Sequence, residues 1–361
     1  MNATAKLNQA GQSLWLDNIT RVILDDGTLQ HFIDDLSVTG LTSNPSIYDK
    51  AVGGSDAYDA DVRAGAERGD SSDDIFFSLA LDDLRRAADL FRPVYDRTGG
   101  VDGFVSLEVS PLIAYKAAET IAEAARLHAL GGKPNLFIKI PGTSEGLAAI
   151  EETIYAGVPV NVTLLFSVDQ YRGCLDAFTR GVERRVADGL TAYVPSVASF
   201  FVSRWDGAIA DRVPAELKNG LGLAVGRAAY VDYRAYFASD RWQRLLNVGA
   251  RPQRLLFAST GTKDPAASDV LYIDGLAAPY TVNTMPQDTL LAYADHGADP
   301  ALLVADAVAA EAGLAAYTAA GLDLDALAAE LQTKGAASFV KSWESLMDRI
   351  SAKVRAVPPA R

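Results

Sequence analysis

The stretch LFIKIPGTSEGLAAIEETIYAGVPVNVTLLFS, residues 136–167, has the pattern of a strand–helix–strand unit. Two short apolar runs, Leu136–Ile140 and Val158–Leu165, flank a segment with helical character. Two strands joined through a helix lie parallel in one sheet, because the crossover returns the chain to the same end of the sheet. This unit therefore predicts an α/β fold built on a parallel sheet.

The same alternation extends along the chain in both directions. Strand-like runs are predicted at Ser13–Ile19, Val38–Ser43, Gly103–Val109, Leu136–Ile140, Val158–Leu165, Ala192–Ser199, Leu255–Ser259 and Tyr280–Thr284. Eight strands alternating with helices over about 280 residues are typical of a (β/α)8 TIM barrel, and a doubly wound open sheet is the alternative. We expect one barrel domain over residues 1–361, with additional helices at about 51–98 and C-terminal helices at about 301–357.

Composition excludes several classes of protein. The chain carries 46 acidic and 33 basic residues, and a net charge of −13 disfavours binding to nucleic acid or to an anionic membrane. No apolar run of about 18 residues occurs, and the first residues lack the apolar core of a secretory signal. With one cysteine, Cys174, and three widely spaced histidines, we expect no disulfide, metal or cofactor, and a cytoplasmic location.

Polar side chains collect on one face of four predicted strands. Residues two apart on a strand point to the same side. The positions opposite the apolar face are Trp15 with Asp17, Ser106 with Glu108, Phe137 with Lys139, and Asn161 with Thr163. Polar groups inside a barrel are unfavourable unless paired, so this set near the C-terminal strand ends indicates an active site. A structural Lys–Glu ion pair is the alternative explanation for single members.

Lys139 suggests the type of chemistry. Removal from water disfavours a charged lysine, and the neutral amine can attack a carbonyl carbon to form a Schiff base. A neighbouring carboxylate would then carry protons. Glu108 is the candidate for that role, with Thr163 able to hold a water molecule against it.

These residues lie in segments that resemble transaldolase, a member of the class I Schiff-base aldolase superfamily. The segments are LWLDNI (Leu14–Ile19), GLTSNPSI (Gly40–Ile47), SLEVSP (Ser106–Pro111), FIKIPGTSEG (Phe137–Gly146), VPVNVTLLFS (Val158–Ser167), SFFVSRWD (Ser199–Asp206), FASTGTKDP (Phe257–Pro265) and YTVNTMP (Tyr280–Pro286). They span nearly the whole chain in this order. The length and the GTKDP segment resemble the longer bacterial type.

The resemblance implies a transferase of the non-oxidative pentose phosphate pathway. Such an enzyme moves a dihydroxyacetone unit from sedoheptulose 7-phosphate to glyceraldehyde 3-phosphate, giving erythrose 4-phosphate and fructose 6-phosphate. Lys139 would form the Schiff base, and Glu108 would act as general acid and base through a water also held by Thr163. Asp17 would take the proton from the C4 hydroxyl as the C3–C4 bond breaks.

The resemblance also implies how the substrate is bound. Asn44 and Asn161 would orient the dihydroxyacetone hydroxyls, with Ser199 near its C1 end, and Arg204 would bind the sugar phosphate. The family often has SPFVGR where this chain has SFFVSR from Ser199 to Arg204, with the same spacing. A second phosphate-binding arginine of shorter relatives has no counterpart, and Ser259 and Lys263 are proposed in its place.

Three other functions stay open at this point. One is a non-catalytic carbohydrate- or phosphate-binding barrel, which would leave the interior Lys139 and Glu108 unexplained. Phe201 stands where related fructose 6-phosphate aldolases carry a tyrosine, which favours transfer over release because a phenyl ring cannot hydrogen-bond to water. A serine hydrolase is the remote alternative, since Gly142–Gly146 matches GxSxG, with Ser144 as nucleophile and His296 as base. Against it, Ser144 is in position to cap the next helix. The expected partners are small sugar phosphates, and a homodimer is one open alternative for assembly.

Overall fold

The computed structural model describes residues 2–356, and at its centre lies one sheet of eight parallel strands. The strands are β1 (Ser13–Leu16), β2 (Val38–Leu41), β3 (Val105–Glu108), β4 (Leu136–Pro141), β5 (Val160–Leu165), β6 (Ser196–Phe201), β7 (Arg254–Ala258) and β8 (Val282–Met285). Their order in space is β2-β1-β8-β7-β6-β5-β4-β3. Backbone bonds from Leu41 N to Phe104 O (2.9 Å) and from Gly103 N to Thr39 O (3.0 Å) join the two ends. The predicted TIM barrel is therefore confirmed, and the open sheet is wrong.

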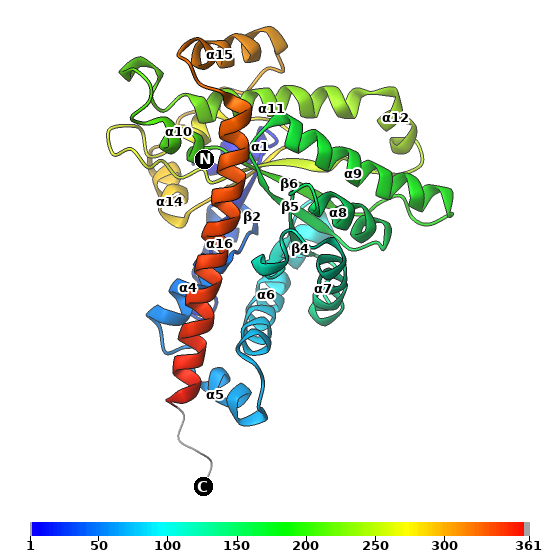
Figure 1. The fold of residues 1–361 in the computed structure, drawn as a ribbon, viewed down its shortest axis with the longest axis vertical. Coiled ribbons are helices and arrows are strands. Elements are labelled where there is room, and N and C mark those ends of the chain that lie inside the picture. The colour runs from blue at the N-terminus through cyan, green and yellow to red at the C-terminus, as the bar shows by residue number, and fades with distance from the viewer. Residues whose placement is uncertain (1, 357–361) are drawn as a thin grey trace.

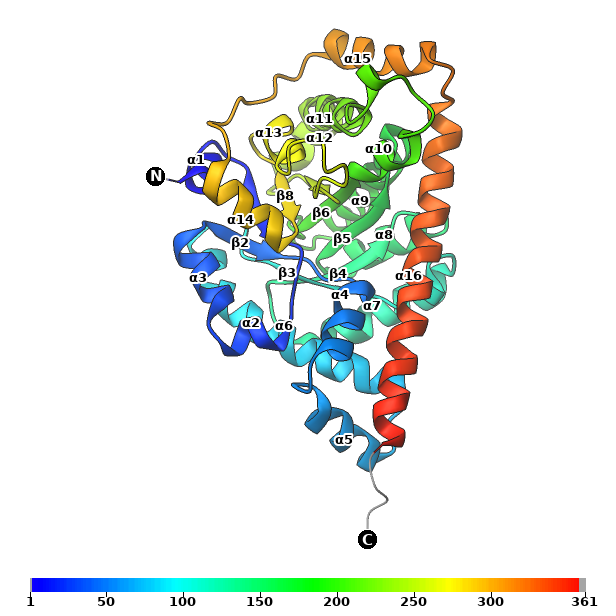
Figure 2. The same cartoon turned by 90° about the vertical axis from the view of Figure 1, so that its left-hand side faces the viewer.

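Helices surround the barrel (Figure 1, Figure 2). In the first half they are α1 (Ala3–Gln9), α2 (Arg21–Asp25), α3 (Thr28–Asp35), α4 (Pro45–Gly54), α5 (Asp59–Arg68), α6 (Ser72–Arg97), α7 (Ala117–Gly131) and α8 (Gly146–Tyr155). In the second half they are α9 (Val168–Ala187), α10 (Ser203–Ile209), α11 (Leu221–Ala238), α12 (Asp240–Leu246), α13 (Leu271–Gly275), α14 (Gln287–His296), α15 (Ala307–Ala319) and α16 (Leu324–Arg355). Within residues 2–356, no helix combines the length and apolar character that crossing a membrane requires.

The eight predicted strands all occur, with shifted ends. The largest shift is in the sixth, which begins at Ser196 and not at Ala192. Pro195 precedes its first residue, and proline has no N–H to donate to a ladder. The strand also continues to Phe201, which carries it two residues beyond the predicted end.

Strict alternation from Val160 and Val162 places Leu164 on the outward apolar face, and this prediction is wrong. This residue has a φ of +61°, and the pairing of β5 with β6 shifts register between Val162 and Leu165. The bulge sends Leu164 toward α16, where a Cβ added to Gly335 would lie 2.9 Å from its Cδ2. Leu165 takes over the outward position next to Val162. A bulge re-aims the side chains that follow it, so alternation holds only as far as Thr163.

Two sets of helices extend beyond the barrel framework. Helices α4, α5 and α6 all lie between β2 and β3. At the other end of the chain, the helical region begins at Ala307 rather than at 301, and residue 357 lies outside the described residues. The long helix α16 runs from near α15 along one side of the molecule to α5, packing against α4, α5 and α6 (Figure 1, Figure 2). It thereby passes the C-terminal ends of the strands.

Candidate active site

Lys139 and Glu108 form a buried ion pair near the C-terminal end of the barrel. They are register partners on β4 and β3, with side chains only 5% and 3% exposed. The Lys139 Nζ lies 3.3 Å from Glu108 Oε2, an ion-pair distance without hydrogen-bond alignment, and donates to the Ser43 carbonyl at 3.2 Å. The predicted inward parity of both residues is confirmed. The amine also faces the pocket that opens above it.

Glu108 sits in an environment that favours its protonated form. Burial raises the pKa of its carboxyl, and the positive charge of Lys139 opposes that rise. Within the described residues neither Glu108 oxygen accepts a hydrogen bond, and the Thr163 hydroxyl has no partner either. Buried polar atoms nearly always have partners, so these groups retain capacity to bind a small polar molecule such as water.

A chain of hydrogen bonds fixes the amide of Asn161 behind Lys139. The Asn161 Nδ2 donates to Ser106 Oγ at 3.1 Å, and Ser199 Oγ donates to Asn161 Oδ1 at 2.7 Å. All three side chains are buried, and they come from β5, β3 and β6. The network holds the inner face of three strands in one arrangement.

Asp17 follows β1 directly and reaches the pocket from the other side of the barrel. Its Oδ1 accepts from Thr42 Oγ1 at 2.7 Å, and that hydroxyl also lies 2.7 Å from Thr284 Oγ1. Burial raises the pKa of Asp17, while Lys139 and the Thr42 hydrogen bond lower it. Thr42 and Thr284 were not among the predicted site residues. Both lie in the segments quoted above, at strand ends close to Asp17.

Arg204 is the second residue of α10, and its side chain extends over two aromatic rings. Its guanidinium carbon lies 5.0 Å from the centroid of Phe201 and 5.7 Å from that of Phe339. Burial lowers the pKa of Arg204, and the acidic groups Glu108 and Asp17 raise it. Phe339 belongs to α16, where Gly335 lets the helix approach, since a Cβ there would lie 3.0 Å from Arg204 Nη1. The long helix thus forms part of the pocket.

The pocket holds about 420 Å³ of space, part of it open to solvent. Of the predicted residues it is lined by Asp17, Asn44, Lys139, Ser199, Phe201, Arg204 and Ser259; Glu108, Asn161 and Thr163 lie behind its wall. Sequence reasoning missed four of the lining residues: Thr42, Ala258, Thr284 and Phe339. The Asn44 Oδ1 caps α4 by accepting from the backbone of Ser46 and Ile47, so its amide nitrogen is the group free to serve the pocket.

Lys263 is the predicted residue that the structure separates from this group. It lines a neighbouring cavity with Ser203 and Lys218 rather than the pocket above Lys139. The two cavities adjoin, because Ser203 Oγ lies 2.9 Å from Ser259 Oγ. Ser203 belongs to the SFFVSR segment and Ser259 to the FASTGTKDP segment, so this contact joins the two segments.

The GxSxG segment does not assemble a nucleophile and base. Ser144 Oγ donates to the neighbouring Glu145 at 2.8 Å, and His296 pairs with Asp269 and Asp295 at the end of α14. The suggestion that Ser144 caps the helix is also wrong. Thr143 Oγ1 accepts from the Gly146 N–H at 3.0 Å, because the helix begins at Gly146. The segment is a strand–helix connection.

Comparison with known proteins agrees with the geometry of the site. The family model described as "Transaldolase/Fructose-6-phosphate aldolase" matches residues 14–350. The chain is 45% identical to "Transaldolase" of Thermobifida fusca (97% of this chain, 98% of that one). It is 46% identical to "Transaldolase" of Saccharopolyspora erythraea (95% of each) and 43% identical to "Transaldolase 2" of Streptomyces coelicolor (100% and 99%).

Proposed function

The chain belongs to the transaldolase/fructose-6-phosphate aldolase family, and we propose on that basis that it transfers dihydroxyacetone between sugar phosphates through a Schiff base on Lys139. The observation that carries the proposal is the buried pair of Lys139 and Glu108, 3.3 Å apart, beneath a pocket that also holds Asp17. Sedoheptulose 7-phosphate is the donor and glyceraldehyde 3-phosphate the acceptor. We place the enzyme in the cytoplasm, where phosphorylated sugars are made.

Schiff-base formation uses Lys139 and Glu108. The neutral amine attacks the ketose carbonyl carbon, and the carbinolamine loses water to give the protonated imine. Glu108 gives and takes the protons of these steps through a water that Thr163 also holds. The support for this assignment is that both Glu108 oxygens and the Thr163 hydroxyl are buried without hydrogen-bond partners in the described residues.

Carbon–carbon cleavage uses Asp17. Its carboxylate takes the proton from the C4 hydroxyl, the C3–C4 bond breaks, and the electron pair moves into the imine to give an enamine on Lys139. The aldose leaves, and the reverse sequence joins the enamine to the acceptor aldehyde. Asn44, Asn161 and Ser199 hold the hydroxyls of the three-carbon unit in this account.

Asp17 must be ionised to act, which predicts the acid limb of the pH profile. Because burial raises its pKa, kcat/KM falls with decreasing pH at a higher pH than for an exposed aspartate. Thr42→Val removes a hydrogen bond that lowers this pKa, so the acid limb of kcat/KM moves to higher pH. Thr39→Val is the control: Thr39 lies on β2, which ends just before Thr42, and within residues 2–356 its hydroxyl bonds only to the Leu14 carbonyl, at 3.3 Å. An unchanged limb in Thr42→Val would argue against Asp17 as the base.

Arg204 binds the sugar phosphate in this proposal, with Ser259 as a further contact and Lys263 contributing positive charge from the adjoining cavity. Arginine binds phosphate through two parallel hydrogen bonds. Arg204→Ala should raise KM for fructose 6-phosphate by about 10- to 100-fold and leave the handling of unphosphorylated fructose less affected. Steady-state kinetics on the two sugars measure the contrast. Equal losses on both would contradict the assignment.

Transfer is distinguished from release by the acceptor. The ring of Phe201 packs against that of Phe166, with the two centroids 5.3 Å apart. It has no hydroxyl that could activate water at the enamine. We therefore expect fructose 6-phosphate alone to react slowly, and addition of erythrose 4-phosphate to raise the rate by about 100-fold or more, since the enamine must wait for an aldehyde. Fast release of glyceraldehyde 3-phosphate and dihydroxyacetone without acceptor would instead identify an aldolase.

A further inference from the structure

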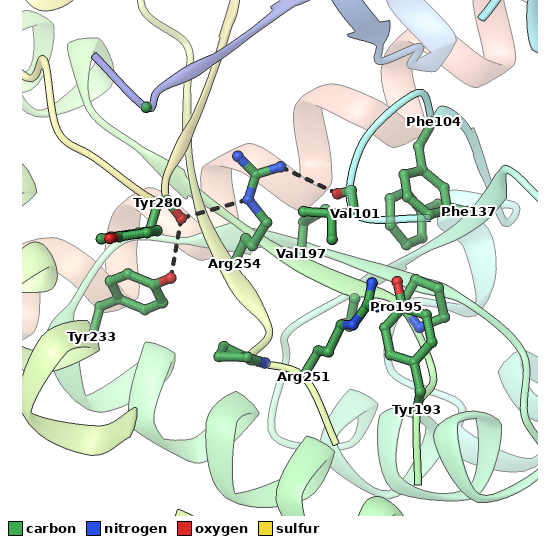
Figure 3. A pocket seen from close by; sticks show the side chains of 13 residues that line it. Val101, Phe104, Phe137, Tyr193, Pro195, Val197, Tyr233, Arg251, Arg254 and Tyr280 are labelled. Atoms are coloured by element: carbon green, nitrogen blue, oxygen red, sulfur yellow. Dashed lines mark hydrogen bonds between the residues drawn. The ribbon is translucent and has the colours of Figure 1, made fainter. Parts of the chain in front are cut away.

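A second cavity opens at the opposite, N-terminal end of the barrel (Figure 3). It holds about 820 Å³ of space continuous with solvent. Its walls come from residues that precede or begin the strands, among them Phe104, Phe137, Val197 and Arg254. The C-terminal ends of the same strands carry Lys139 and Glu108, so the barrel interior separates this cavity from the proposed active site.

Aromatic rings form two sides of this N-terminal cavity. Phe104 and Phe137 stack with centroids 4.1 Å apart and, with Tyr193, lie on one side in Figure 3. Tyr233 and Tyr280 lie on the other side. Phe104, Phe137 and Tyr233 are at most 4% exposed, so Tyr193 and Tyr280 are the rings that a guest can contact. A planar aromatic guest gains offset or edge-to-face contacts with such rings beyond the area it buries.

The cavity also carries positive charge that the protein leaves available. The guanidinium carbon of Arg251 lies 4.5 Å from the centroid of the Tyr193 ring, and its Nη1 donates to the Gly99 carbonyl at 2.8 Å. Within residues 2–356 no carboxylate oxygen lies within 4.0 Å of this guanidinium. Arg254, by contrast, is bonded to several backbone carbonyls and to Ser13. Its nearest acid, Asp102 at 3.9 Å, already accepts from the Trp15 indole. In a chain of net charge −13, an unpaired arginine beside a cavity is a candidate anion contact.

Tyr280, at the rim of the cavity, has an unfavourable backbone conformation. Its φ is +67°, a region that residues other than glycine rarely adopt, and the residue is 65% exposed. Its carbonyl accepts from Tyr233 Oη at 3.0 Å, and its N–H donates to the Gly11 carbonyl at 2.8 Å. Such strain persists only where surrounding contacts impose it, and it is concentrated at sites of function.

We propose that the N-terminal cavity binds a small planar aromatic anion. The ring packs against the accessible tyrosine rings, Tyr193 and Tyr280, and the carboxylate, sulfonate or phosphate oxygens accept hydrogen bonds from those N–H groups of Arg251 that do not bond to Gly99. Arg254 has its bonds within the protein and shapes the floor. This site does not depend on the proposed transfer reaction, and its ligand differs in class from the sugar phosphates of the other end.

Calorimetric titration with naphthalene-2-sulfonate tests the proposal. We expect saturable binding to the full chain, and about tenfold or greater weakening in Arg251→Gln, which keeps most of the side chain but removes its charge. Arg63→Gln is the matched control, because Arg63 is exposed and distant in sequence from the cavity. Arg204→Gln reports on binding at the other pocket, and it should leave the affinity unchanged.

Two further measurements complete the test. Tyr280→Gly removes the ring but suits the positive φ, so the fold is kept and affinity should fall several-fold. Neutral 2-naphthalenemethanol should bind more weakly than the sulfonate, and equally to the original chain and to Arg251→Gln. The proposal is overturned by no binding of the sulfonate at millimolar concentration, by unchanged affinity in Arg251→Gln, or by a loss confined to Arg204→Gln.

Discussion

Replacing Lys139 with methionine should lower transaldolase activity by at least about 10⁴-fold, the largest effect of any single substitution in this chain. Methionine matches the length of the lysine stem but has no amine, so neither the carbinolamine nor the imine can form. The rate of fructose 6-phosphate formation from sedoheptulose 7-phosphate and glyceraldehyde 3-phosphate measures the loss. Activity within tenfold of the original would remove Lys139 from the mechanism.

The control for this variant addresses folding. Lys139 and Glu108 are both buried, and removing one partner of a buried pair costs about 3–5 kcal/mol when the other stays charged. The double variant Lys139→Met with Glu108→Gln leaves no unpaired charge. It should recover stability in thermal unfolding while remaining inactive, which separates loss of chemistry from loss of fold.

Glu108→Gln should reduce kcat by about 10²- to 10⁴-fold, because the amide cannot give or take the protons of imine formation and hydrolysis. The defect lies in forming the adduct on Lys139, so borohydride trapping should slow in parallel with turnover. Thr163→Val should slow the same step to a smaller extent, since it removes only the proposed second contact of the water.

Asp17→Asn is the matched comparison for Glu108→Gln. Both replace a carboxylate with an amide of the same shape, but Asp17 acts after the imine has formed. Trapping of Asp17→Asn with fructose 6-phosphate should therefore yield an intact six-carbon phosphate adduct on Lys139. If Glu108→Gln accumulates that adduct and Asp17→Asn forms none, the two assigned roles are reversed.

The inward face of the barrel could be predicted from short-range pattern. A strand's alternation has a period of two, so Lys139, Glu108 and Asn161 follow from their apolar neighbours once the strands are recognised. The register of β3 with β4, which sets Glu108 beside Lys139, depends on the whole barrel, and no pattern within either strand contains it.

Other parts of the pocket could not be predicted from local sequence. Leu164 adopts a positive φ that no residue type in VNVTLL requires, and the bulge comes from packing against α16 and from Gln332, which donates to the Leu164 carbonyl at 3.0 Å. Phe339 lies far along the chain from Arg204, and only the path of α16 brings them together. Thr42 and Thr284 become recognisable as site residues only in the fold, where Thr42 donates to Asp17 and Thr284 lies against Thr42.

The most direct test of the account is to reduce the enzyme with borohydride in the presence of fructose 6-phosphate and to map the modified peptide by mass spectrometry. The account predicts a reduced three-carbon dihydroxyacetone adduct on Lys139 and on no other lysine. An unmodified Lys139 in enzyme that turns over the sugar, or an adduct on a different lysine such as Lys263, would contradict it.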